Sequence, residues 1–140
     1  MAYTLFLLKC FVVHLKKQKA FYHAFNAIFG KTGRTASENV IVELLKSKCI
    51  PVLYYGLEAC PFNKSLVKSL QFAINICFSK IFHIKDSSLI LECVTVFNCS
   101  VMDAIKRRHV KSCNTFCMSD NELCVMFRER TNKELLNIDF

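Results

Sequence analysis

The sequence is poor in the residues that interrupt helices. Of 140 residues only three are glycine and two are proline, and there is no tryptophan. Glycine and proline punctuate turns, so their scarcity disfavours a fold of many short strands. Hydrophobic residues make up 53% of the chain, which excludes intrinsic disorder. The composition therefore predicts a domain built from long helices.

Acidic residues are few and scattered, which disfavours metal-dependent catalysis. Polymerase chemistry needs two or three carboxylates that converge on divalent cations. The aspartates stand apart from one another and from other acids: Asp86, Asp103, Asp120 and Asp139. The tyrosine-rich tract Tyr54–Gly56 is followed by Leu57 and Glu58, not by paired aspartates. Because no phosphate-binding glycine loop or nucleophile–base pair stands out either, we expect no catalysis by the chain alone, no cofactor and no small-molecule substrate.

Cysteine is abundant, with nine residues. Most lie at apolar helix positions, which is typical of reduced thiols in an intracellular protein of the cytoplasm or nucleus. His109, Cys113, Cys117 and Cys124 have zinc-ligand side chains. However, residues eight apart on one straight helix are separated by about 12 Å, whereas each ligand must lie about 2.0–2.3 Å from the ion. We therefore expect packed thiols and no bound metal.

Long uncharged apolar runs are also missing. The run Leu5–Leu15 is split by Lys9 and lacks the basic start and cleavage site of a signal peptide. It is also too short to cross a bilayer. We expect no transmembrane segment.

Positive charge is plentiful and unevenly spread. The net charge is +8, and residues 1–48 hold eight Lys and Arg against only Glu38 and Glu43. A basic first third favours an anionic partner, either nucleic acid or a lipid surface. The alternative is a basic face that is merely solvated.

The apolar pattern has helical periodicity from Lys16 onward, with apolar residues recurring at three- and four-residue spacings. Residues 1–15 fit a strand or a helix equally well and are left unassigned. We expect residues 16–140 to form a single helical domain. The fold class predicted is all-α, a small bundle of about five to seven helices joined by short loops.

Three helix boundaries can be predicted from local signals. Thr35, or alternatively Ser37, has the spacing of a helix cap, and the helix that it begins should end before Pro51. Ser87 or Ser88 should cap a later helix, and Asp120 or Asn121 should cap the last one.

Several blocks of sequence carry more than periodicity. They are FYHAFNAIFGKTGR at 21–34, ELLKSKCIPVLYYGLEACP at 43–61, and NKSLVKSL at 63–70 with FSKIF at 78–82. In order and spacing they resemble the region just downstream of the palm in reverse transcriptases of non-LTR (LINE-type) retrotransposons. RRHVKSCNTF at 107–116 and SDNELC at 119–124 resemble the weaker tail of that region.

The resemblance implies a helical thumb followed by a connector, which in the family packs on the palm and grips the template–primer duplex through its backbone. On this sequence the gripping surface would comprise Lys16, Lys17, Lys19, Lys31, Arg34, Lys46 and Lys48. The family's palm, with its metal-binding aspartates, has no counterpart in these 140 residues. A thumb without its palm would expose apolar surface, so self-association is expected.

Two functions are therefore expected. The first is a non-catalytic fragment of an RNA-directed DNA polymerase that retains sequence-independent binding to RNA or DNA. The alternative is a small basic helical interaction protein that binds an anionic membrane surface or an acidic partner.

Overall fold

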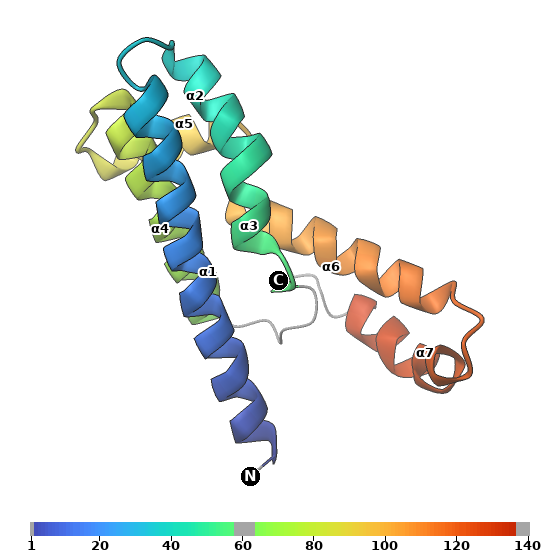
Figure 1. Ribbon diagram of the computed structural model, residues 1–140. Helices are drawn as coiled ribbons and strands as arrows, with labels where there is room; N and C mark the ends of the chain where they lie inside the picture. Colours follow the sequence, from blue (N-terminus) through green and yellow to red (C-terminus); the bar gives the residue numbers. More distant parts are fainter. Residues whose placement is uncertain (1, 58–63, 137–140) are drawn as a thin grey trace. The chain divides into compact units, whose positions relative to one another are not determined.

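The computed structural model describes residues 2–57 and 64–136 (Figure 1). Within these residues every regular element is helical: α1 (Ala2–Thr32), α2 (Glu38–Leu44), the π-helical turn η1 (Leu45–Cys49), α3 (Ile50–Tyr54), α4 (Lys64–Phe82), α5 (Ser87–Val96), α6 (Val101–Cys117) and α7 (Glu122–Leu136). The prediction of a small all-α fold is confirmed. The segment 1–15, which the sequence left unassigned, is helical from Ala2 onward as part of α1.

The chain divides into two compact units, Met1–Val101 and Met102–Phe140, where the sequence suggested a single domain from residue 16 onward. The distribution of buried apolar side chains accounts for the division. Nearly all of them lie in the first unit, whereas the second unit buries only Ile105 and Cys113 among its described residues.

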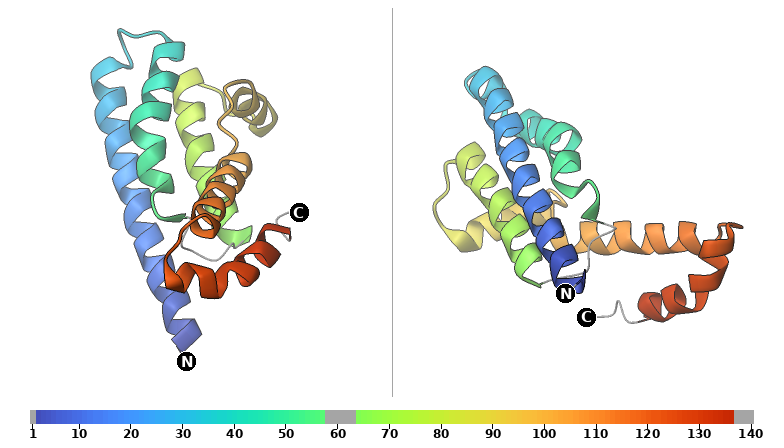
Figure 2. Two further views of the ribbon diagram at one scale, coloured as in Figure 1. Left: turned by 90° about the vertical axis from the view of Figure 1, so that its right-hand side faces the viewer. Right: turned by 60° about the horizontal axis from the view of Figure 1, so that its bottom comes forward.

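The described part of the first unit consists of three helical rods, α1, α2–η1–α3 and α4, together with the shorter helix α5. Helix α1 packs against α2, η1 and α3 and also against α4. Gln18 Nε2 donates to Ser69 Oγ at 2.6 Å, and Lys80 Nζ donates to Asn26 Oδ1 at 3.3 Å. From the first of these bonds to the second, the bonded residue lies nearer the C-terminus on both α1 and α4, so the two helices are parallel. The run α2–η1–α3 returns in the opposite direction beside them, and α5 packs on α4 (Figure 2).

Phenylalanine dominates the core of this unit. Phe21, Phe25 and Phe78 are at most 1% exposed. The ring of Phe78 lies 6.0 Å from the rings of both Phe82 and Phe97, which joins α4 to the end of α5. The apolar stripe of α4 is buried as the periodicity indicates, and comprises Val67, Leu70, Ala73, Ile74, Cys77, Phe78 and Ile81.

The helix expected to end before Pro51 ends as an α-helix at Leu44, but helical backbone continues through η1 and α3 to Tyr54. Pro51 lies at the start of α3, immediately after η1. A proline ring clashes with the carbonyl four residues earlier in a regular α-helix. The wider π turn directly before Pro51 can relieve that clash, so helical backbone continues past the proline.

Two helix caps also differ from those expected first. Helix α2 begins after Ser37, the alternative cap, and no side chain bonds to its first turn. Helix α5 is capped by Asp86, whose carboxylate accepts from the backbone N–H of Ser88 at 2.9 Å. Neither serine caps α5, because the carboxylate one residue earlier is a charge-assisted acceptor. Asn121 caps α7 as predicted, accepting from the N–H of Leu123 at 3.0 Å.

The second unit is a pair of helices in which α7 folds back on α6. Arg128 Nη2 donates to the carbonyl of Ser119 at 3.3 Å, and the Cys117 thiol lies 3.3 Å from Asn132 Oδ1. Helix α7 leaves several large apolar side chains exposed: Leu123, Val125, Met126, Phe127 and Leu136. None of the described residues of α7 is among the buried hydrophobic residues, so this helix has no buried apolar stripe.

One stretch, Ser87–Cys117, is apolar and long enough to cross a membrane by length and composition alone. In the structure it forms two helices. Helix α5 has ten residues, and Asn98 then takes a left-handed conformation with φ 54° before α6 begins. Because a transmembrane helix needs about 20 continuous residues, this stretch is weak support for a membrane span.

Candidate nucleic-acid interface

The basic residues picked out by the sequence all lie in the first unit, but they fall into three groups. Lys16, Lys17 and Lys19 are on α1. Lys31 is in the last turn of α1 and Arg34 follows in the loop, both exposed. Lys46 and Lys48 belong to η1. The structure gives these groups different environments: Lys17 and Lys46 contact other residues of the chain, whereas the other five are exposed.

The outward face of α1 carries a row of basic residues. Lys16 and Lys19 are exposed, and His23 is exposed on the same face, since side chains three and four residues apart share a helix side. From Lys16 to His23 the row covers about 10 Å of helix axis. None of the three forms an ion pair or hydrogen bond with a described residue, so their polar ends are open to a ligand. The sequence reasoning omitted His23 from the site, although its spacing from Lys16 and Lys19 was visible.

Lys17 is half-buried and contacts another part of its own chain. Its ammonium group donates to the carbonyl of Tyr55 and lies 4.8 Å from the centre of the Tyr55 ring. Tyr55 terminates α3, so the lysine places a positive charge at the negative end of that helix. Lys17 therefore fastens α3 to α1, and this contact leaves it poorly placed to bind a phosphate.

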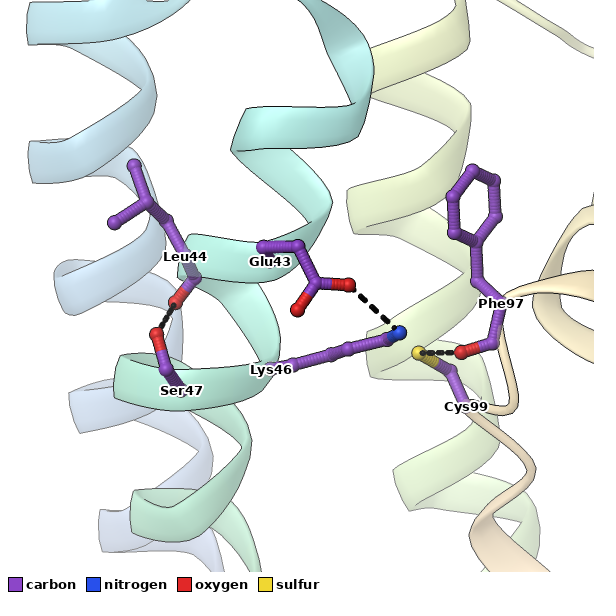
Figure 3. Close-up of polar contacts among 6 residues, drawn as sticks. All are labelled: Glu43, Leu44, Lys46, Ser47, Phe97 and Cys99. Atoms are coloured by element: carbon purple, nitrogen blue, oxygen red, sulfur yellow. Dashed lines mark hydrogen bonds and ion pairs between the residues drawn. The ribbon is translucent and has the colours of Figure 1, made fainter.

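Lys46 is likewise engaged within the protein. Its Nζ lies 3.0 Å from the Glu43 carboxylate and 5.8 Å from the centre of the Phe97 ring (Figure 3). The nearby Cys99 thiol, which is buried, donates to the carbonyl of Phe97 at 3.6 Å. Lys46 thus links the α2–η1 rod to the end of α5. Lys48 remains exposed on η1.

The buried thiols show no sign of nucleophilic chemistry. Burial, reinforced by the Cys49 thiol, raises the pKa of Cys77 to about 12. Burial also raises the pKa of Cys49 and of Cys99 above the ordinary thiol value. A reactive cysteine needs a lowered pKa, because the thiolate is the nucleophile. These cysteines fill space in the core.

Metal-binding side chains do not gather in the part of the chain that the structure describes. Among those residues no three His, Cys, Asp or Glu side chains lie close enough to hold an ion. Asp86 caps α5, while Asp103 and Asp120 are exposed on separate segments of the chain. Asp139 lies outside the described residues.

An exposed aromatic residue on α4, Phe72, was missed by the sequence reasoning. It is 65% exposed on α4, three residues from Ser69, which bonds to α1. Periodicity alone could have excluded it from the apolar stripe of α4. The parallel pairing of α1 with α4 places it on the helix that packs beside the lysines of α1.

The fold and this face define an all-α helical bundle with a basic helix surface. Neither a protein-family model nor a curated protein nor a solved structure matches the chain.

Proposed function

We propose that this protein is a non-catalytic, thumb-like fragment of a non-LTR retrotransposon reverse transcriptase that binds nucleic acid without sequence preference. The observation that carries the binding is the open row of Lys16, Lys19 and His23 along α1. The resemblance of the sequence blocks supplies the family, and the long helices are compatible with it. Lys31 and Arg34 extend the positive charge to the end of the helix, about 22 Å from Lys16.

Binding at this row is electrostatic. Lysine offers a point charge to a phosphate, whereas base reading favours planar, bidentate groups such as those of Arg, Asn and Gln. Affinity then arises from the release of counterions and falls with salt. Each neutralised phosphate contributes about −0.9 to the slope of log affinity against log salt on duplex DNA.

The test is the salt dependence of duplex binding for Lys16→Gln/Lys19→Gln. Losing two phosphate contacts should flatten the slope by about 1.8 units and weaken all sequences alike. The matched control is Lys85→Gln/Lys111→Gln, which removes the same charge from exposed positions off α1. Lys17→Gln should leave the slope nearly unchanged, because Lys17 is bound to Tyr55.

Equal flattening by the control pair would show a diffuse attraction and no interface on α1. Absence of duplex binding by the parent protein at low salt would refute the binding function altogether. Primer extension on an RNA template by the purified chain would refute its non-catalytic character.

A second candidate function is association with an anionic membrane. One observation favours it: Val12, Val13 and Leu15 are between 42% and 48% exposed and directly precede Lys16 on α1. Exposed apolar groups next to lysines suit an anionic lipid surface. Flotation with vesicles that contain phosphatidylserine, compared with neutral vesicles, distinguishes this function from nucleic-acid binding.

A further inference from the structure

We infer that the seam between α1 and α4 is a binding site for single-stranded nucleic acid, with Phe72 as a stacking platform for a base and Lys19 as a neighbouring phosphate contact. The inference rests on the proposed nucleic-acid binding and names the form of nucleic acid that this surface suits.

The position of Phe72 follows from the two hydrogen bonds that join the helices. Gln18 to Ser69 and Asn26 to Lys80 fix α1 and α4 in parallel register. Phe72 follows Ser69 by three residues, so it lies along the same side of α4 and between the two bridges. Its side chain is 65% exposed, so it turns to the outer side of the seam.

Lys19 occupies the outer side of the seam from the opposite helix. It follows Gln18, the residue that contacts α4, and its side chain is exposed. His23 lies one turn further along the same face. An exposed phenyl ring on α4 and a row of basic side chains on α1 therefore face solvent from two packed helices.

Rigid support makes this ring suitable for stacking. Ala73 and Ile74, which follow Phe72 in the chain, are fully buried, so the backbone that carries the ring is held by the core. Phe72 has no ring partner among the described aromatic residues, unlike Phe78, Phe82 and Phe97, which contact one another. A face of the ring is open, and an exposed Phe on a core helix is otherwise unfavourable in water.

Single strands fit this arrangement better than duplexes. Proteins that bind single strands combine positive charge along the backbone with aromatic rings on which unpaired bases stack, and such stacking tolerates any sequence. Bases in a duplex are already stacked on each other, so the ring gains little there. The lysine side chains favour a polyanion such as nucleic acid, and the exposed ring favours unpaired bases and therefore the single-stranded form.

The experiment compares binding of an oligothymidylate of about 12 nucleotides with binding of a blunt duplex of equal length, for the parent and for Phe72→Leu. The variant should lose about 5- to 150-fold in single-strand affinity, as expected for one stacked base. Its duplex affinity and its salt slope should stay at the parent's values. The control is Phe127→Leu on α7, which makes the same change at another exposed phenylalanine.

An unchanged unfolding midpoint for Phe72→Leu excludes a folding defect as the cause of weaker binding. If the parent binds both probes and Phe72→Leu weakens neither, or both equally, the single-strand site is overturned while the proposed function stands. If the parent binds neither probe, both are overturned. The parent's molecular mass can also be measured as a function of protein concentration. If Phe72→Leu abolishes a concentration-dependent change of mass but does not weaken single-strand binding, the ring forms a contact between copies of the chain. That result also overturns the single-strand site.

Discussion

His14 is the least expected residue in the core of the first unit. It is 4% exposed on α1, and neither ring nitrogen has a hydrogen-bond partner among the residues that the structure describes. Burial, together with the charge of Lys17, lowers the pKa of His14 below its ordinary value of 6.5. The folded protein therefore holds a neutral imidazole there.

The sign of the pH effect follows from that lowered pKa. Below about pH 6.5 the unfolded chain binds a proton at His14 that the folded chain resists, so unfolding is favoured as the pH falls. The free energy of unfolding should decrease between pH 7.5 and pH 5.5, measured by urea denaturation. His14→Leu should remove this part of the pH dependence and raise stability, since a buried unpaired polar group is lost.

His23→Gln is the matched control, because His23 is exposed on the same helix. Its substitution should leave the free energy of unfolding at pH 7.5 near the parent's value, because the side chain is exposed. Identical pH profiles for His14→Leu and the parent would show that His14 does not titrate from a buried site.

Local signals in the sequence predicted single residues unequally. Asn121 as a cap and the buried stripe around Ile74 and Phe78 were predictable, because capping and helical periodicity depend only on neighbours in the chain. The contact of Lys17 with Tyr55 was not predictable, because the two residues lie 38 positions apart in the chain. Among several adjacent lysines, only tertiary packing decides which one faces the protein.

At the scale of the element, the end of α3 depends on Gly56. Its φ is +76°, and a Cβ there would lie 3.1 Å from Lys17 Nζ. A side chain in this left-handed region costs about 1–2 kcal/mol, and it would also crowd the Lys17–Tyr55 contact. Gly56→Ala should therefore lower the free energy of unfolding by at least this amount, as measured by chemical denaturation.

Gly30 provides the opposite case within the same chain. It lies inside α1, it is exposed, and a Cβ would meet no atom within 4 Å. Gly30→Ala should raise stability by about 0.5–1 kcal/mol, because alanine favours a helix interior. If Gly56→Ala, like Gly30→Ala, leaves stability unchanged or raises it, the left-handed turn at Gly56 does not control the end of α3.

Elements as a whole were more predictable than their boundaries. Most α-helical segments of the described residues begin in stretches whose periodicity indicated a helix. The exceptions are α1, which begins in the ambiguous first fifteen residues, and α3, which begins where the preceding helix was expected to end. The passage of the helix through Pro51 was not predictable, because the π turn that accommodates the ring has no signature in the sequence. The parallel pairing of α1 and α4, which creates the candidate site, is also a tertiary property.

At the scale of the molecule, the two units differ in how they are stabilised. The first unit buries aromatic and aliphatic residues from α1 through α5 around a common core. The second relies on Ile105, Cys113 and a few polar contacts, while α7 exposes Leu123 and Met126 at 64% and 74%. A helical pair of about 40 residues rarely folds alone without further support. The expected self-association would supply such support by covering α7.

Hydrogen exchange of the intact protein tests this difference between the units. Regions with few buried contacts open at low free energy, whereas core helices open only on global unfolding. Amides of α4 around Ile74 should be the slowest to exchange. Amides of α7 should exchange faster by at least about two orders of magnitude. The reason is that roughly 3 kcal/mol or more separates the free energy of local opening from that of global unfolding. The exchange should be measured at low and at high protein concentration to control for self-association. Self-association through α7 would slow the exchange of α7 amides only at high concentration. Equal protection of α4 and α7 in dilute protein would mean that the second unit is held as firmly as the first, and that its exposed apolar residues do not weaken it.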